Sequence, residues 1–343
     1  MPVRLAVALV TCLALLGGCV AAHASGAESP SCTETDLPVT GPDGPATMHG
    51  QLCLPAGGPP AAVQLLVHGG TYNRYYWDLP YDPDRYSYQR DMAAHGYATF
   101  AVDLLGTGRS TRPPAARLLI GAEAASLHDV VGHLRAGRAG GVRFGKVVIA
   151  GHSVGSGIVA FEAARYHDVD GVILTGITHV PSVPALTTGA GTGLEPAFLD
   201  RRFEGADPAY FVTKPGARAG LFYAKNDSDP RVIAADEATK DEVSAPGMAT
   251  VAVFGIVMPA TSGITVPVFQ AVGGSDVLFC GVLALRDCST AASLREQEAP
   301  YYSAAANLTT YVLPGAGHSL ALHENAGAYR DATRAWLTAC FGL

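Results

Sequence analysis

The chain has 343 residues, of which 48% are hydrophobic and 15% charged, and its formal net charge is −7 at pH 7. This much apolar material is enough for a large core, which excludes a disordered chain. Nucleic-acid binding needs a basic stripe, and the sequence has none, so we expect no nucleic-acid partner.

The first 24 residues have the pattern of a secretory signal peptide. Arg4 precedes an apolar run over residues 5–16, and Ala22-His23-Ala24 offers the small-x-small cleavage pattern. At about 1.5 Å per residue the run is roughly 18 Å long, too short to cross a hydrocarbon core of about 30 Å. Leu16-Gly17-Gly18-Cys19 also resembles a bacterial lipobox. We therefore expect a secreted, extracellular protein. One alternative is lipid anchoring on the cell surface through Cys19, and we expect no other membrane association. The other alternative is that these residues form an N-terminal core helix.

Five cysteines follow the predicted signal peptide: Cys32, Cys53, Cys280, Cys288 and Cys340. In an exported protein cysteines form disulfides more often than metal sites, and no CxxC pair typical of zinc is present. A Cys280–Cys288 bridge would close a short loop, a Cys32–Cys53 bridge would tie down the N-terminal strands, and Cys340 would stay a thiol. Five choices of the unpaired cysteine and three pairings of the rest leave the pairing open.

Short apolar runs alternate with helical patterns along the chain. Runs rich in Val, Ile and Leu predict strands over residues 61–68, 97–103, 146–150, 171–176, 265–273 and 309–313. Apolar residues at helical spacing predict helices over residues 121–136, 154–167 and 329–340. This alternation predicts an α/β fold with a mainly parallel, doubly wound sheet, whose ligand site lies at the carboxyl ends of the strands.

The alternation stops between about residues 181 and 263. This stretch is rich in Pro, Gly and Thr and contains one clear helix start, Asp229-Pro230, where an N-cap precedes proline at the first helical position. We interpret residues 181–263 as a cap or lid inserted into a core formed by residues 25–180 and 264–343.

Gly151-His152-Ser153-Val154-Gly155 has the G-x-S-x-G form, between a predicted strand and a predicted helix. Glycines at both ends allow a turn so sharp that the serine oxygen projects outward. A serine hydroxyl needs a neighbouring base to become a nucleophile. The context therefore predicts Ser153 as a catalytic nucleophile.

The other two members of a catalytic triad are expected at later strand ends. His318, in a loop just after the last strand, is the predicted base, with His323 as its nearest competitor. A carboxylate must orient the histidine and stabilise its charged form. Asp276 follows the strand over residues 265–273 and is the predicted acid; Asp103 also ends a strand, but the chain order Ser, acid, His favours Asp276.

Backbone N–H groups should stabilise the negative oxygen that forms during the reaction. Val154, the residue after the nucleophile, supplies one predicted donor. Gly70, in His68-Gly69-Gly70, supplies the second, with Thr71 as the next choice. His68 and His152 are interpreted as packed framework residues.

These segments resemble the α/β-hydrolase family over nearly all of the chain after residue 45. His68-Gly69-Gly70 resembles its oxyanion loop, and Ser153, Asp276 and His318 match its nucleophile, acid and base in order. The stretch from Asp103 to Ser110 resembles a family motif that is usually structural. Thr71 stands where HGGG lipases and esterases have a third glycine, and serine at 153 differs from the aspartate of relatives that open epoxides or displace halide. The resemblance implies an α/β-hydrolase fold. We expect neither a metal nor a cofactor, and no CxxC pair or His-rich cluster argues for zinc.

The expected reaction is hydrolysis of a small-molecule ester or lactone with an apolar part, through an acyl-enzyme on Ser153. The aromatic residues Tyr72, Tyr75, Tyr76 and Trp77 either line the acyl pocket or pack against the cap. The cap segment with Val251, Val253, Phe254, Ile256, Val257 and Met258 either faces the cleft or forms the core of the cap. Perhydrolase or haloperoxidase chemistry, C–C bond hydrolysis and a catalytically silent binding protein are the alternatives.

Overall fold

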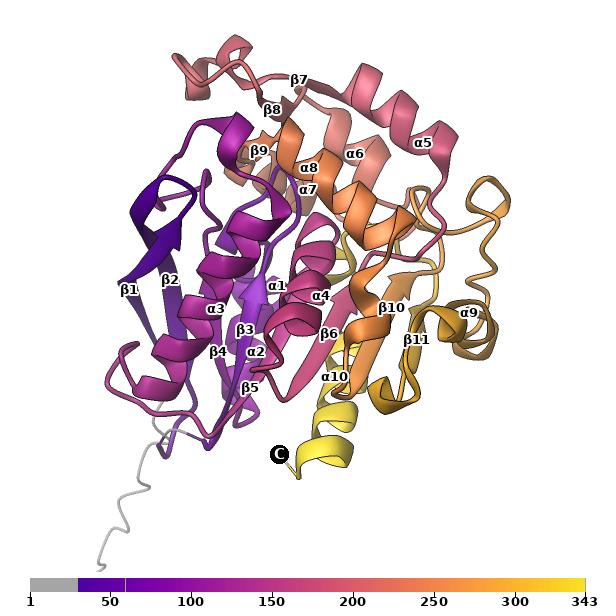
Figure 1. The fold of residues 1–343 in the computed structure, drawn as a ribbon. Coiled ribbons are helices and arrows are strands. Elements are labelled where there is room, and N and C mark those ends of the chain that lie inside the picture. The colour runs from indigo at the N-terminus through magenta and orange to yellow at the C-terminus, as the bar shows by residue number, and fades with distance from the viewer. Residues whose placement is uncertain (1–29, 59, 343) are drawn as a thin grey trace, which may run out of the picture.

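The computed structural model describes residues 30–58 and 60–342. These residues contain an eight-stranded central sheet with helices on both faces (Figure 1). In spatial order the strands are β1 (Ser31–Gly41), β2 (Gly44–Leu54), β4 (Ala98–Val102), β3 (Ala62–Val67), β5 (Lys146–His152), β6 (Gly171–Thr175), β10 (Val268–Gly273) and β11 (Thr309–Leu313). The predicted α/β class with a mainly parallel sheet is confirmed.

All six predicted strands are present, with small shifts in their ends. They pair in parallel from β4 to β11, and β3, β4, β6 and β10 are buried at every residue. Burial on both faces explains why their sequences are continuous apolar runs. β1 and β2 form an antiparallel hairpin that joins the sheet through β4.

Two layers of helices cover the sheet (Figure 1). α3 (Ile120–Ala136) and α4 (Val154–Tyr166) pack together on one face, and α2 (Tyr88–Ala94) and α10 (Ala326–Phe341) lie on the other. The short α1 (Pro83–Tyr86) precedes α2, and α9 (Ala291–Glu298) packs beside β11. α3, α4 and α10 correspond to the three predicted helices.

The stretch between β6 and β10 contains more regular structure than its sequence suggests. It holds α5 (Val183–Thr188), α6 (Ala217–Phe222), α7 (Pro230–Thr239) and α8 (Ala245–Ala252), and a small antiparallel sheet of β7 (Leu194–Pro196), β8 (Tyr210–Thr213) and β9 (Val243–Ser244). α7 begins as predicted, because the Asp229 carboxylate accepts a hydrogen bond from the Arg231 N–H at 2.8 Å. Figure 1 shows α5, α6 and α8 above the upper end of the central strands.

The structure forms two disulfides, Cys32–Cys53 and Cys280–Cys288, and leaves Cys340 as a half-buried thiol. Cys32 and Cys53 lie directly opposite each other in the β1–β2 ladder. Within residues 30–58 and 60–342, no helix has the length and apolar character needed to span a membrane. The predicted signal peptide, including Cys19, lies outside the described residues.

Candidate active site

Ser153 lies in a sharp turn between β5 and α4. Its backbone has φ of 53° and ψ of −118°, a strained conformation for a residue with a side chain, and its N–H donates to the Thr175 carbonyl at 2.8 Å. A Cβ atom on Gly151 would lie 2.5 Å from the Gly155 carbonyl oxygen, and one on Gly155 would lie 2.3 Å from that of His68. Only glycine fits at both positions, so the motif has the physical basis expected of a nucleophile turn.

His318 and Asp276 are in direct contact beyond the ends of β11 and β10. The His318 Nδ1–H donates to Asp276 Oδ2 at 2.9 Å, and the Leu278 N–H donates to Asp276 Oδ1 at 2.9 Å. Both side chains are buried. The His318 ring also lies 5.7 Å from the Phe279 ring and 5.5 Å from the Phe222 ring, measured between centroids. These contacts fix the orientation of the imidazole.

The two competing residues have other partners. His323 Nε2 accepts hydrogen bonds from the Gly317 and Ala224 N–H groups, and its Nδ1–H donates to the Ser319 carbonyl. Asp103 accepts from the Arg74 and Arg109 N–H groups at 2.9 and 3.0 Å. Both residues therefore organise loops.

Ser153 and His318 line the same cavity of about 420 Å³. No hydrogen bond joins their side chains among the described residues; such catalytic contacts often form only when substrate is bound. The rest of the wall is almost wholly apolar and includes Leu186 of α5, Phe222 of α6 and Val251 of α8. Among the residues that the structure describes, Thr71 is the only other polar side chain of the lining, and no Asp, Glu, Lys or Arg contributes to it.

Three residues of the cavity wall have backbone N–H groups that are free to donate. The Gly70, Thr71 and Val154 N–H groups have no acceptor among the described residues, and all three residues line the cavity with Ser153. Val154 is the first residue of α4, whose first N–H groups have no partner within the helix. A Cβ atom on Gly70 would lie 3.1 Å from the Val154 side chain, so the two predicted donors are close neighbours.

His68 and His152 lie in the framework below the cavity. The His68 Nδ1–H donates to the Gly69 carbonyl at 2.8 Å, and its Nε2 accepts from the Leu104 N–H at 3.1 Å. The His152 ring stacks on Tyr76 with centroids 4.1 Å apart. Burial lowers the pKa of both histidines, so both are neutral near pH 7 and unsuited to a second proton-transfer role.

A buried arginine from the region over the site reaches the loop that carries Gly70 and Thr71. Arg218 of α6 is fully buried, and its guanidinium forms a two-point ion pair with Asp236 at 2.9 and 2.8 Å. It also donates to the carbonyl oxygen of Thr71 at 3.0 Å and lies 4.0 Å from the centroid of the Tyr72 ring. Thr71 has a positive φ of 63°, so this contact holds a strained part of the loop.

Sequence reasoning missed Arg218, and the only local signal was a single arginine in the otherwise small and apolar segment 217–222. It also missed Phe222, Leu278 and Phe279, which line the cavity. These residues belong to segments that fold back over the serine from distant parts of the chain.

Of the two interpretations left open for the aromatic residues after His68-Gly69-Gly70, the structure does not support the acyl pocket, because none of Tyr72, Tyr75, Tyr76 and Trp77 belongs to the cavity wall. Tyr72, Tyr76 and Trp77 are buried, and Tyr72 packs on Phe222 with ring centroids 5.5 Å apart. In the apolar segment 251–258, Val251 and Ile256 line the cavity, whereas Val253, Val257 and Met258 are exposed and Phe254 packs on Phe161.

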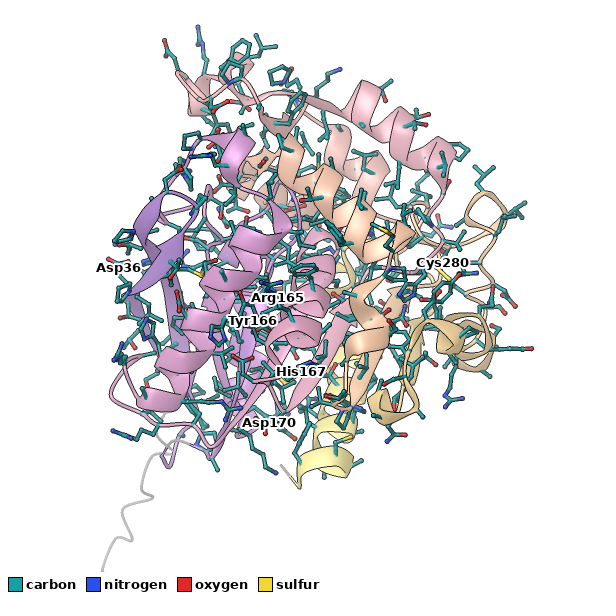
Figure 2. The ribbon with its side chains drawn as sticks, viewed as in Figure 1. Asp36, Arg165, Tyr166, His167, Asp170 and Cys280 are labelled. Carbon is teal, nitrogen blue, oxygen red and sulfur yellow. A yellow bond between two sulfur atoms is a disulfide. The ribbon has the colours of Figure 1, made fainter. Side chains whose placement is uncertain are left out.

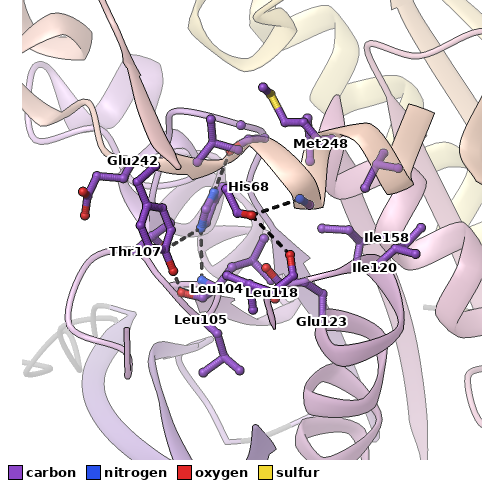
Figure 3. A pocket seen from close by; sticks show the side chains of 18 residues that line it. His68, Leu104, Leu105, Thr107, Leu118, Ile120, Glu123, Ile158, Glu242 and Met248 are labelled. Atoms are coloured by element: carbon purple, nitrogen blue, oxygen red, sulfur yellow. Dashed lines mark hydrogen bonds between the residues drawn. The ribbon is translucent and has the colours of Figure 1, made fainter. Parts of the chain in front are cut away.

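A second, much smaller cavity of about 30 Å³ is lined in part by His68, Gly69 and Gly70 (Figure 3). Glu123 and Glu242 border it as well. Glu123 Oε2 is buried and has no hydrogen-bond partner in the described part of the chain, and burial raises the pKa of this carboxyl from its ordinary value of 4.5 to about 8.

The buried Glu123 predicts a pH-dependent stability. Between about pH 4.5 and 8 the folded chain holds a proton on Glu123 that the unfolded chain releases. The contribution of Glu123 to the free energy of unfolding is therefore fully present below pH 4.5 and is lost as the pH rises toward 8. Within this range the free energy of unfolding should fall by about 1.4 kcal/mol per pH unit. Urea unfolding at pH 5, 6.5 and 8 should show a flatter dependence for Glu123→Gln than for the parent; parallel curves would contradict the prediction.

Comparison with known proteins agrees with this fold. A model of the alpha/beta hydrolase family matches residues 64–332. Among solved structures, an esterase from Thermogutta terrifontis has a TM-score of 0.59 and 20% identity, covering 90% of this chain and 99% of its own. A protein from Burkholderia cenocepacia described as an aryl esterase has a TM-score of 0.57 and 18% identity, covering 90% of this chain and 100% of its own.

An N-acyl homoserine lactonase, solved with N-hexanoyl homoserine, has a TM-score of 0.56 and 16% identity, covering 91% of this chain and 98% of its own. A search of curated proteins finds no match. The family match spans most of the chain and includes the segments that carry Ser153, Asp276 and His318. The chain therefore belongs to the alpha/beta hydrolase family.

Proposed function

We propose that this protein hydrolyses a carboxylic ester or lactone with a neutral, apolar acyl part, through an acyl-enzyme on Ser153. The observation that carries the proposal is that Ser153 and His318 line one apolar cavity while His318 is hydrogen-bonded to Asp276. The esterases and the lactonase that share its fold support this class of reaction.

In the proposed mechanism, His318 Nε2 takes the proton of Ser153 Oγ as this oxygen attacks the substrate carbonyl carbon. Asp276 holds the imidazole through Nδ1 and stabilises its positive charge. The Gly70 and Val154 N–H groups donate to the negative oxygen. His318 returns the proton to the leaving alcohol, and the ester bond breaks. A water molecule, deprotonated by His318, then releases the acid and regenerates Ser153.

In this proposal residues 181–263 form the cap, and residues 25–180 and 264–343 form the hydrolase core. Leu186, Leu221, Met248 and Val251 of the proposed cap contribute to the cavity wall, which supports a role in substrate binding. We also propose that the chain is exported and that residues 1–24 are removed as a signal peptide. The two disulfides are consistent with an oxidising compartment.

The uncharged wall predicts discrimination by substrate charge. A carboxylate buried in such a cavity without a partner loses its hydration, at a cost of several kcal/mol. We therefore expect kcat/KM for p-nitrophenyl hexanoate to exceed that for the mono-p-nitrophenyl ester of adipic acid by about 100-fold or more, which corresponds to about 2.7 kcal/mol. The two acyl chains have the same number of carbons and differ in the terminal carboxylate.

Initial rates over a series of acyl lengths and a matching series of lactones test the function directly. The proposal expects turnover that depends on Ser153. Equal rates for the hexanoate and adipate esters would overturn the assignment of the apolar cavity as the acyl site. Absence of turnover of every ester and lactone above that of Ser153→Ala would overturn the proposed reaction.

A further inference from the structure

A cluster of three ligand-type side chains lies far along α4 from Ser153. His128 of α3, Glu162 of α4 and Asp168, just after α4, each bring one ligand atom to within 4.8 Å of the others. His128 Nδ1 lies 2.6 Å from Asp168 Oδ2. Figure 2 labels Tyr166 and His167, which mark this end of α4, remote from the helices that cover the active site.

Glu162 is the unusual member of the cluster. Its side chain is fully buried, and neither carboxylate oxygen has a hydrogen-bond partner among the described residues. Asp168 Oδ1 is likewise buried and unpartnered. No Lys or Arg side chain of the described chain pairs with Glu162, and burial together with the nearby Asp168 charge raises the pKa of Glu162 to about 9. Burying a carboxyl group without a partner costs free energy. A bound cation would supply the positive partner that these oxygens lack.

The other two proposed ligands, His128 and Asp168, are partly exposed and lie between the buried Glu162 carboxyl and solvent. The His128 side chain is 44% exposed and the Asp168 side chain 22% exposed, so an ion has a path from solvent. The His128 ring stacks on Tyr166, with centroids 4.2 Å apart and an interplanar angle of 12°, which holds the imidazole beside the carboxylates.

We propose that His128, Glu162 and Asp168 bind one divalent transition-metal ion, with Zn²⁺ as the best match and water at the open position. Calcium takes six to eight oxygen ligands, whereas one imidazole and two carboxylates complete three positions of a tetrahedral zinc site. Tetrahedral ligands at about 2.0–2.2 Å from zinc lie about 3.4 Å apart, so small side-chain shifts close the cluster around the ion. The ion would join α3, α4 and the segment that leads to β6, and its role would be structural.

No ligand spacing in the sequence marks this site, because its members come from two helices and a loop. The expectation of a metal-free protein, which accompanied the absence of a CxxC pair or His-rich cluster, is revised by this proposal. The site is independent of ester hydrolysis, since it is lined by none of the cavity residues around Ser153.

Calorimetric titration of the untagged, chelator-treated chain with Zn²⁺, Ca²⁺ and Mg²⁺ tests the proposal. The parent should bind one Zn²⁺ per chain, with a higher unfolding temperature in its presence. Glu162→Gln and His128→Gln should each weaken zinc binding by at least about 10-fold, since second-shell changes alone reach that size. His95→Gln is the matched control, because His95 is an exposed histidine beside a single carboxylate, that of Asp91.

Glutamine has the shape of a protonated glutamate, so Glu162→Gln should fold whether or not a metal binds. Zinc binding by the parent that is lost in this variant and retained in His95→Gln supports the site. No stoichiometric zinc binding by the parent, or unchanged affinity in Glu162→Gln, would overturn it and leave Glu162 and Asp168 as a carboxyl pair that shares one proton.

Discussion

Ser153→Ala should lower kcat for a p-nitrophenyl ester by at least about 10⁴-fold, because alanine offers no oxygen to form the acyl-enzyme. The Ser153 side chain makes no hydrogen bond among the described residues, so its removal should change the free energy of unfolding by less than about 0.5 kcal/mol. Steady-state rates and urea unfolding curves on the same preparations measure the two quantities separately.

Ser126→Ala provides the matched control for this substitution. Ser126 is a buried serine of α3 that donates to the Glu123 carbonyl and lies outside the cavity wall. Its replacement should leave kcat near the parent value. A Ser153→Ala protein that retained the parent rate would rule out Ser153 as the nucleophile, whatever the behaviour of the control.

Arg218→Met should lower the free energy of unfolding by about 3–5 kcal/mol, because it leaves the buried Asp236 carboxylate without its cation. It also removes the donor to the Thr71 carbonyl. A displacement of about 1 Å of the loop that carries Gly70 and Thr71, the proposed oxyanion loop, would reduce kcat by about 100-fold. We expect kcat to fall more than KM rises, since in the proposed mechanism this loop binds the reacting oxygen and the apolar wall binds the acyl chain.

Arg231→Met is the control, because Arg231 pairs with Asp229 by the same chemistry but has a side chain that is 75% exposed. Loss of this exposed ion pair should lower the free energy of unfolding by no more than about 1 kcal/mol. Arg218→Lys keeps the charge without the two-point geometry and provides a readout if the methionine variant does not fold. Stability losses of equal size for Arg218→Met and Arg231→Met, or an unchanged kcat in a folded Arg218 variant, would contradict the positioning role.

The central strands were predictable because burial on both faces leaves a continuous apolar run in each of them. The hairpin of β1 and β2 has no such signal, since β1 lies at the sheet edge and is mostly exposed or half-buried. β7, β8 and β9 contain only two to four residues each, too few for periodicity to show. The sequence therefore showed residues 181–263, the proposed cap, only as a break in the strand–helix alternation and did not show the helices and strands within it.

The site was predictable where chemistry and chain position coincide. Ser153 stands in a local motif, and Asp276 and His318 follow strands whose carboxyl ends meet at one edge of the sheet. Arg218 and its partner Asp236 are separated by irregular chain, so no spacing reveals the pair. The aromatic run from Tyr72 to Trp77 left two interpretations open, because a sequence does not show whether a loop side chain points into a cavity or away from it.

The most direct measurement is the site of labelling by a fluorophosphonate probe, which bonds covalently to an activated serine oxygen. Peptide mass spectrometry of the labelled native protein should find one adduct per chain, on the peptide that contains Ser153, and none on that peptide in Asp276→Asn at the same short reaction time. An unlabelled native protein, or an adduct confined to another serine, would contradict the proposed acyl-enzyme mechanism.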